Sequence, residues 1–181
     1  LLVSGDKDQA NTKTNEITNT SSEAPQKPKT IKQKDLSPAA LDAFKAFKKM
    51  QARTQVGIAY NSYSEALADV RLALNMYMES TASKEFIELT AGLKKAYLCY
   101  DLAGKIWKEK FRGSSGPEAL IPKVFYPQLF DAFPDSDKEI KDGGVVYKGH
   151  DKEYIDIDTA VSYLFSKSSE EVQKASRLIE R

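Results

Sequence analysis

The stretch that decides the fold is ASKEFIELTAGLKKAYLCYDLAGKIWKEKF, residues 82–111. Its apolar residues recur at alternating steps of three and four, the period of one face of an α-helix. This first stripe comprises Phe86, Leu89, Leu93, Ala96, Tyr100, Ala103 and Trp107. A second stripe, on another side of the helix, comprises Ile87, Leu98, Leu102 and Ile106. A helix that is apolar over so wide an arc packs against more than one neighbour, so the pattern predicts the central helix of a bundle.

Three small residues inside this stretch also carry expectations. Gly92 and Gly104 each cost a helix about 1 kcal/mol relative to Ala, so we expect them to let another helix approach closely. Cys99 lies between the two stripes, and no His lies near it in sequence to activate its thiol. We therefore interpret Cys99 as a small core residue and not as a nucleophile.

Three further helices are predicted around this one. The first begins at Pro38 with Ser37 as its N-cap and ends between Gly57 and Tyr60. The second follows a capping box formed by Ser62 and Glu65, and the last begins at an Asp158 cap. The second helix has one apolar face, made of Tyr63, Ala66, Leu67, Val70, Leu74 and Tyr77. The last has another, made of Val161, Leu164, Phe165, Val172, Ala175 and Ile179. These patterns predict an all-α fold, an antiparallel up-down helical bundle.

A long and partly irregular crossover precedes the last helix. Its three prolines forbid a long helix, but strongly apolar residues between them predict one or two short helices packed over the bundle. A turn at Gly143-Gly144 allows residues 145–147 to pair with Tyr154-Ile155 as a small β-hairpin. The spacing of Ser168 and Glu171 again suits a capping box, which would break the last helix.

The N-terminal 35 residues differ in composition from the rest. They contain no aromatic residue, and from residue 6 onward they are polar, so they cannot bury enough apolar surface to order themselves. We interpret 6–35 as a disordered polar tether, and 1–5 (LLVSG) as a signal-peptide remnant of an exported bacterial protein. Asp6 stands where a lipoprotein would carry its lipidated Cys, so a membrane tether lacks its usual attachment residue. The predicted domains are therefore 1–35 as leader and 36–181 as bundle.

Composition excludes several classes of function. The chain has 181 residues, with 27 Lys and Arg against 26 Asp and Glu, and this balance argues against a nucleic-acid-binding protein. One Cys excludes an intramolecular disulfide and Cys-rich metal sites, and one His, His150, excludes motifs that need two. No apolar run approaches the length of a membrane span. The sequence indicates no cofactor, no metal and no catalytic constellation.

The acidic stretch 135–158 invites a calcium interpretation. Asp135, Asp137 and Glu139 alternate as at the start of an EF-hand loop. However, Ile140 stands where the loop needs Gly, and Val146 stands where it needs a bidentate carboxylate. A solvated acidic loop is therefore the favoured interpretation, and cation binding remains its alternative.

Six residues form the candidate contact site for a ligand or a partner. Two are polar residues on the apolar stripe of the first helix, where they need hydrogen-bond partners. The others bring a cation and aromatic rings to one end of the bundle, where such groups bind an anion or simply stack. The set is Gln51, Arg53, Thr54, Tyr60, Tyr63 and Trp107.

One resemblance can be stated on particular residues. The run ARTQVGIAY at 52–60, followed by Tyr63 and by LAGKIWK at 102–108, resembles an uncharacterised class of exported bacterial helical proteins. The resemblance implies a secreted helical bundle and supplies no activity. Together with the leader, it favours a periplasmic or extracellular location.

Two hypotheses of function follow. The first is an exported, tethered and non-enzymatic helical module that binds a protein or a cell-envelope partner. The alternative is a sensor or carrier of a small molecule, with a pocket among the first three helices that is lined by Arg53, Tyr60 and Trp107.

Overall fold

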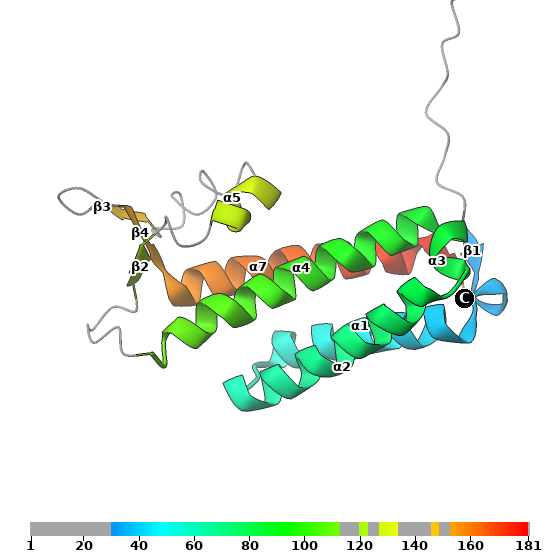
Figure 1. Cartoon of the computed structure of the whole chain (residues 1–181), viewed down its shortest axis with the longest axis horizontal. Helices are drawn as coiled ribbons and strands as arrows, with labels where there is room; N and C mark the ends of the chain where they lie inside the picture. Colours follow the sequence, from blue (N-terminus) through cyan, green and yellow to red (C-terminus); the bar gives the residue numbers. More distant parts are fainter. Residues whose placement is uncertain (1–29, 113–119, 123–126, 134–145, 149–152, 181) are drawn as a thin grey trace, which may run out of the picture.

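The computed structural model describes residues 30–112, 120–122, 127–133, 146–148 and 153–180, and these form an antiparallel helical bundle in two layers (Figure 1). One layer pairs α1 (Pro38–Val56) with α2 (Tyr60–Glu79). The other pairs α4 (Ile87–Glu109) with α7 (Ile157–Leu178) along most of their lengths. This architecture confirms the predicted all-α up-down bundle.

The core lies between the two layers and follows the predicted stripes. Aromatic and aliphatic side chains from all four long helices are fully buried there, which is the main stabilising contribution of such a fold. The largest of them are Tyr63, Tyr77, Tyr100, Phe47, Met50, Leu89, Leu93 and Ile106. The second stripe of α4 is only partly buried, because Ile87 is 71% exposed and Leu98 is 36% exposed, whereas Leu102 and Ile106 are covered. This stripe therefore contributes less to the core than predicted.

The helix predicted over 82–111 is interrupted. A short helix, α3 (Ala82–Glu85), ends at Phe86, whose φ of −104° and ψ of 64° are not helical, and α4 begins directly afterwards. The Thr90 hydroxyl donates to the Ser83 carbonyl oxygen at 2.8 Å across the break. The prediction of one continuous helix was therefore wrong at Phe86. There the Thr90 hydroxyl takes the place of a backbone N–H as donor to the Ser83 carbonyl.

Two of the predicted helix caps were also wrong. No side chain caps the start of α2, which begins at Tyr60, so Ser62 and Glu65 lie inside the helix and form no capping box. In α7 the cap is Asp156, whose Oδ1 accepts hydrogen bonds from the backbone N and the hydroxyl of Thr159, both at 2.8 Å. Asp158 is exposed in the first turn, and both its oxygens accept from Lys110 Nζ at 2.8 Å. The prediction for the first helix was right, since Ser37 Oγ accepts from Ala40 N at 3.2 Å.

The last helix is continuous. The predicted break at Ser168–Glu171 does not occur, because the Ser168 hydroxyl donates to the Phe165 carbonyl within the helix at 2.9 Å. Ser168 is fully buried against the bundle, so packing overrides the local capping signal.

The crossover contains a small three-stranded sheet. Antiparallel pairing joins β4 (Glu153–Asp156) to β3 (Val146–Lys148), with Val146 opposite Ile155 and Tyr147 opposite Tyr154. This register confirms the predicted hairpin. A strand that was not predicted, β2 (Leu120–Pro122), pairs with the other edge of β4.

One short helix of the crossover, α5 (Pro127–Ala132), lies over the α4–α7 layer (Figure 1). Leu129 is fully buried, and the Phe133 ring packs edge-on against Tyr163 of α7 at 6.3 Å between centroids. A short helix over the bundle was predicted. The predictions for residues 134–145, which include the calcium-like start, and for His150 lie outside the described residues.

The domain begins earlier than the sequence indicates. Strand β1 (Ile31–Lys32) pairs in parallel with β5 (Ile179–Glu180). A 3₁₀ turn (Gln33–Asp35) then leads to Leu36, whose side chain is buried. Residues 30–35 therefore belong to the ordered domain, and the predicted tether was too long at this end. The rest of the predicted leader lies outside the described residues.

Candidate functional site

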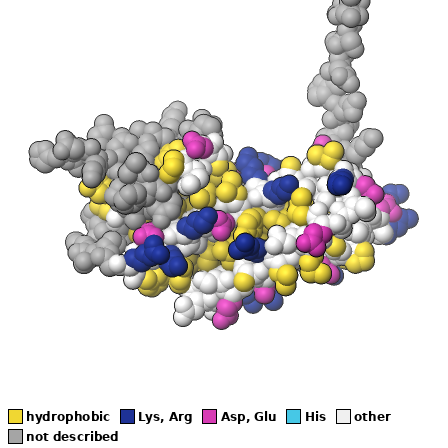
Figure 2. All heavy atoms as spheres, viewed as in Figure 1, with side chains coloured by type: hydrophobic (Ala, Val, Ile, Leu, Met, Phe, Trp, Pro, Cys, Tyr) yellow, Lys and Arg dark blue, Asp and Glu magenta, His cyan; other side chains and the backbone are white. Residues whose placement is uncertain are grey.

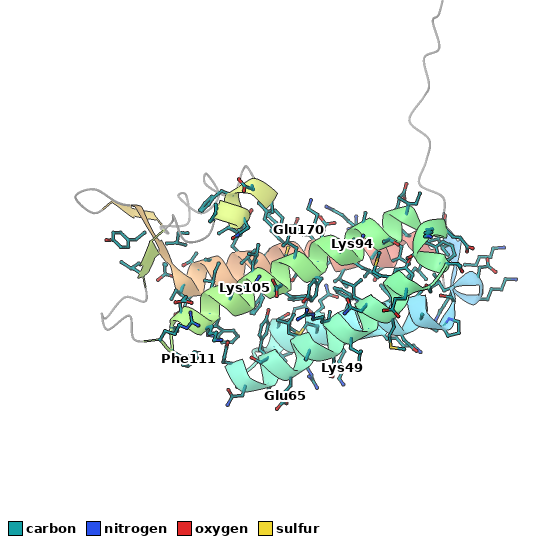
Figure 3. All side chains as sticks on the ribbon, viewed as in Figure 1. Lys49, Glu65, Lys94, Lys105, Phe111 and Glu170 are labelled. Atoms are coloured by element: carbon teal, nitrogen blue, oxygen red, sulfur yellow. The ribbon has the colours of Figure 1, made fainter. Side chains whose placement is uncertain are left out.

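The end of α1, the start of α2 and the end of α4 meet at the end of the bundle that carries most of the predicted contact residues. Gly57 ends α1 with a φ of 89°, a left-handed conformation that glycine adopts without strain, and α2 begins three residues later. This tight turn places Tyr60 against Trp107, in the last turns of α4, and against Phe111, which lies just after the helix and is labelled in Figure 3. The antiparallel order of the helices thus brings the aromatic residues together, as their positions predict.

The aromatic end is the ring cluster formed by Tyr60, Tyr63, Trp107, Phe111 and Phe165. Tyr60 contacts Trp107 edge-on with 5.5 Å between ring centroids, and it contacts Phe111 at 4.9 Å. Tyr63 lies 5.5 Å from Trp107 and 5.4 Å from Phe165. Such edge-to-face and tilted geometries are the favourable ones for aromatic rings, so the cluster is a built structure and not a chance encounter.

Exposure rises from the inside of this cluster to its outside. Tyr63 is fully buried, Tyr60, Trp107 and Phe165 are half-buried, and Phe111 is 63% exposed. Val56, on the last turn of α1, is 86% exposed. The sequence analysis missed Phe111 and Val56 as site residues. The sequence signal that could have identified Phe111 is its position one turn after Trp107, the last residue of the first predicted apolar stripe.

The two polar candidates on α1 have partners inside the protein. Gln51 is nearly buried, and its Nε2 donates to Ser169 Oγ at 2.7 Å and to the Ser169 carbonyl at 3.3 Å. Its Oε1 accepts from Lys48 Nζ at 2.9 Å. The Thr54 hydroxyl bonds back to the carbonyls of Met50 and Gln51 in its own helix. Gln51 thus joins α1 to α7, and Thr54 is satisfied by the backbone of its own helix.

Two buried tyrosines adjoin the cluster. The Tyr63 hydroxyl donates to the Tyr100 carbonyl oxygen at 2.5 Å, which ties α2 to α4. The Tyr100 hydroxyl is buried and has no hydrogen-bond partner of good geometry among the described residues. Burial raises the pKa of Tyr100, and the nearby hydroxyls of Ser168 and Thr54 reduce that rise. Burial likewise raises the pKa of Tyr63, so both phenols stay neutral at physiological pH.

Arg53 does not join the aromatic end. It lines a shallow groove of about 250 Å³ between α1 and α2, together with Lys45, Lys49 and Asp69. Within the described part of the chain, Arg53 has no ion pair and no ring contact. The structure therefore separates Arg53 from Tyr60 and Trp107, which the sequence analysis grouped with it.

Cys99 behaves as the sequence predicts. The thiol is fully buried, and burial raises its pKa to about 12, with further contributions from nearby charges. A thiol that stays protonated at neutral pH is a poor nucleophile. Among the residues that the structure describes, no group of three or more His, Cys, Asp or Glu side chains is arranged to hold a metal ion.

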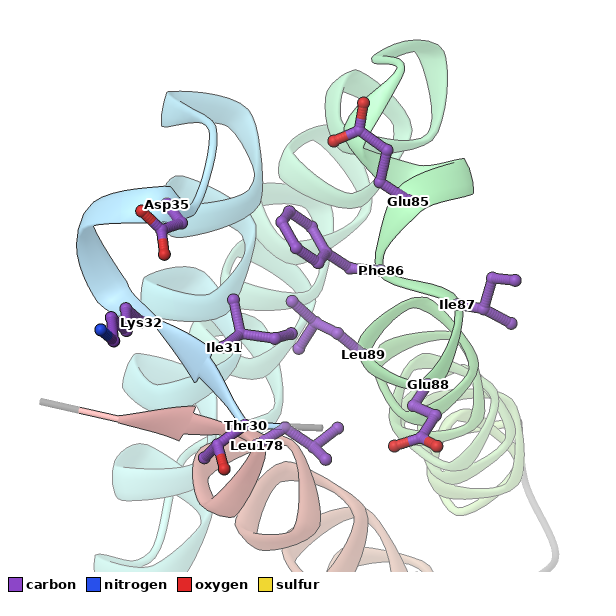
Figure 4. Close-up of a pocket in the computed structure, with 10 residues that line it drawn as sticks. All are labelled: Thr30, Ile31, Lys32, Asp35, Glu85, Phe86, Ile87, Glu88, Leu89 and Leu178. Carbon is purple, nitrogen blue, oxygen red and sulfur yellow. The ribbon is translucent and has the colours of Figure 1, made fainter. Parts of the chain in front are cut away.

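Two adjacent cavities lie at the opposite end of the bundle, where β1 enters. One, of about 510 Å³, is lined by Ile31, Phe86 and Leu89 (Figure 4). The other, of about 580 Å³, runs between α4 and α7 over Gly92 and Ala175. Both are open grooves with mixed charges at the rim, and neither contains a predicted site residue.

No family model, no curated protein and no solved structure matches the chain. None of the described helices is long and apolar enough to cross a membrane. The functional conclusion therefore has to come from the geometry of the aromatic end and its surroundings.

Proposed function

We propose that the chain is a non-enzymatic helical module that binds a protein or a cell-envelope partner through its aromatic end. The observation that carries this proposal is Phe111, a large apolar ring that is 63% exposed although it packs on Tyr60. Val56 adds a second exposed apolar side chain to the same end of the bundle, at the last turn of α1.

Clustered exposed apolar side chains are typical of binding surfaces. Single exposed apolar residues are common, but a large exposed ring next to other exposed or half-buried apolar groups marks an interaction site. Aromatic rings are also the residues that most often dominate binding energy at interfaces. Because Tyr60 already holds the Phe111 ring at 4.9 Å, less conformational entropy is lost when a partner covers it.

The other groups of the candidate site support a structural assignment. Gln51, Thr54 and Cys99 are engaged or buried within the bundle, and Tyr63 joins two helices. In the aromatic end, the exposed ring of Phe111 and the half-buried rings of Tyr60 and Trp107 remain accessible to a partner. Export and tethering by the polar leader, and a periplasmic or extracellular location, complete the proposal and rest on the composition of residues 1–29.

The alternative of a small-molecule sensor or carrier has less support. It requires Arg53, Tyr60 and Trp107 to surround a common pocket. Arg53 instead lines the α1–α2 groove, while Tyr60 and Trp107 pack on each other.

Site-specific photo-crosslinking tests the proposal. A photoreactive amino acid replaces Phe111 in one variant and Leu72, on α2, in a matched control, since Leu72 is 64% exposed and lies away from the aromatic end. Both variants are expressed in the source cells and irradiated. We expect an adduct with a protein or a lipid from position 111 and none from position 72. Equal adducts from both positions, or none from either, would contradict the proposal.

A further inference from the structure

A band of cations adjoins the aromatic end along the side of the bundle where α2 meets α4. We define this basic face by five exposed residues. They are Arg71, Lys94, Lys105, Lys108 and Arg112. Lys94 and Lys105 follow one another along α4, and Phe111 lies just after its end (Figure 3). The space-filling view shows Lys and Arg side chains spread over this side with apolar surface between them (Figure 2).

Within the described part of the chain, the positive charge of the basic face is only partly neutralised. Its two carboxylates are Asp101, paired with Lys105 Nζ at 2.6 Å, and Glu109, paired with Arg112 at 3.0 Å. Five cations against two carboxylates leave a net charge of +3. Among the described residues, Arg71, Lys94 and Lys108 form no ion pair.

Apolar groups lie between these cations. Tyr97 is half-buried between α2 and α4, where the charges of Arg71, Asp101 and Lys105 all act on its phenol. Leu98 is 36% exposed beside it, and Phe111 is exposed at the end of the row. The face therefore combines positive charge with rings and aliphatic side chains on the side of the bundle where α2 and α4 meet.

We propose that this basic face binds an anionic lipid surface, with Phe111 and Tyr60 placed at the level of the lipid headgroups. The inference rests on the proposed function and specifies the chemistry of the partner. Lys and Arg side chains attract anionic headgroups, and aromatic rings favour the interface between headgroups and hydrocarbon, so their combination on one face suits this partner.

The shape of the face favours a lipid surface over a small anion or an acidic protein. Lys94 and Lys108 are 14 residues apart on one helix, which corresponds to about 21 Å. The cavities of this structure between residues 30 and 112 and along α7 that are lined by cations use Lys32, Lys45, Lys49, Arg53, Lys95, Lys174 and Arg177, and not the five cations of the basic face. Cations at this spacing can contact several headgroups of an extended anionic surface at once, whereas one small anion cannot reach them all.

Vesicle co-sedimentation of the full chain tests the inference. The probes are vesicles of phosphatidylcholine alone and of phosphatidylcholine mixed with phosphatidylglycerol. We expect binding to the anionic vesicles only, and weaker binding as salt is added. Replacing Lys94→Gln and Lys108→Gln together should lower the partition coefficient about 25-fold, about fivefold for each charge. Phe111→Ser should weaken binding without changing its salt dependence.

The matched control replaces Lys45→Gln and Lys49→Gln, two exposed cations on α1 outside the basic face. If the face binds lipid, this variant should bind nearly as the parent does. Equal losses in both double variants would show a general charge effect and overturn the inference, as would an absence of binding to anionic vesicles. If vesicles fail while position 111 still gives a protein adduct, the partner is a protein, and the proposed function survives without this inference.

Discussion

Two seams join the layers of the bundle, and they are built differently. In the α2–α4 seam, Tyr63 and Leu67 approach Gly104 so closely that an added Cβ would lie 3.2 Å and 3.4 Å from their side chains. In the α1–α7 seam, Gln51 and Gln55 donate hydrogen bonds to Ser169. Buried apolar surface dominates the first seam, which also contains the hydrogen bond from Tyr63 to the Tyr100 carbonyl. The second seam contains the side-chain hydrogen bond that joins α1 to α7.

The difference separates stability from register. Burial of a large ring removes apolar area from water and is worth several kcal/mol, but it specifies the position of the partner helix only loosely. A hydrogen bond between side chains contributes about 1 kcal/mol net, yet its geometry admits one position of α1 along α7. We infer that burial in the α2–α4 seam contributes more to stability, and that the hydrogen bonds of both seams set the register of the layers.

The largest expected effect is the loss of the Tyr63 ring. Tyr63→Ala removes a fully buried side chain, its contacts with Trp107 and Phe165, and its hydrogen bond to Tyr100. We expect the free energy of unfolding to fall by about 3–5 kcal/mol, measured by urea denaturation.

Gln51→Ala is the matched change in the other seam. It removes the bonds to Ser169, and we expect a loss of about 1–2 kcal/mol by the same measurement. If Gln51→Ala lowered the free energy of unfolding as much as Tyr63→Ala does, the inferred difference between the two seams would be wrong.

Alkaline pH provides a second way to weaken the apolar interior. Burial raises the pKa of Cys99 from 9.0 to about 12, and it raises the pKa values of Tyr63 and Tyr100 above 10.0. The folded protein therefore keeps protons that the unfolded chain releases above about pH 9, so the stability is complete below that pH and is lost as pH rises. We expect a loss of about 1.4 kcal/mol per pH unit for each such group, measured by urea denaturation between about pH 8 and pH 11.

Cys99→Ala is the control for this titration. Without the thiol, the decline should begin about one pH unit higher, where the phenols of the unfolded chain ionise. If the free energy of unfolding stayed constant to about pH 11, the pKa values of these groups would be the same in the folded and unfolded protein, and the prediction would be wrong.

The two glycines of α4 give the smallest and most specific comparison. At Gly92 an added Cβ would meet only ordinary contacts, the Glu171 carbonyl at 3.8 Å and Ala175 at 3.9 Å. Gly92→Ala should therefore stabilise the protein by about 1 kcal/mol, the difference in helix propensity. Gly104→Ala raises helix propensity by the same amount, but the added Cβ forces the Tyr63 ring to move. The stability of this variant should therefore rise less than that of Gly92→Ala, or fall. Thermal unfolding of both variants checks the order.

Much of the fold could be predicted because periodic apolar residues dominate it. The stripes of α1, α2 and α7 appear in the core as the spacing indicates, and the alternation of the helices brings Tyr60 next to Trp107. The hairpin partner of Tyr154 was also correct. These features depend on patterns repeated over many residues, which a few exceptions do not obscure.

The features that could not be predicted depend on single tertiary contacts. The break at Phe86 is linked to the hydroxyl of Thr90, which bonds the Tyr77 hydroxyl and the Ser83 carbonyl across it. The start of α2 at Tyr60 coincides with ring contacts to α4 that override the Ser62 capping signal. In the candidate site, the orientation of Arg53 toward the α1–α2 groove and the exposure of Phe111 depend on where neighbouring helices end. Local spacing carries no information about those positions.

The short pair β1–β5 has a consequence for the order of folding. Ile31 pairs with Ile179, so the first strand of the domain has no partner until the last helix is in place. The α1–α2 hairpin needs only neighbouring residues, but α4 needs α7 before its second side is covered. Closure of the domain is therefore a late event of folding, and a chain that lacks α7 would leave the buried faces of three helices open to aggregation.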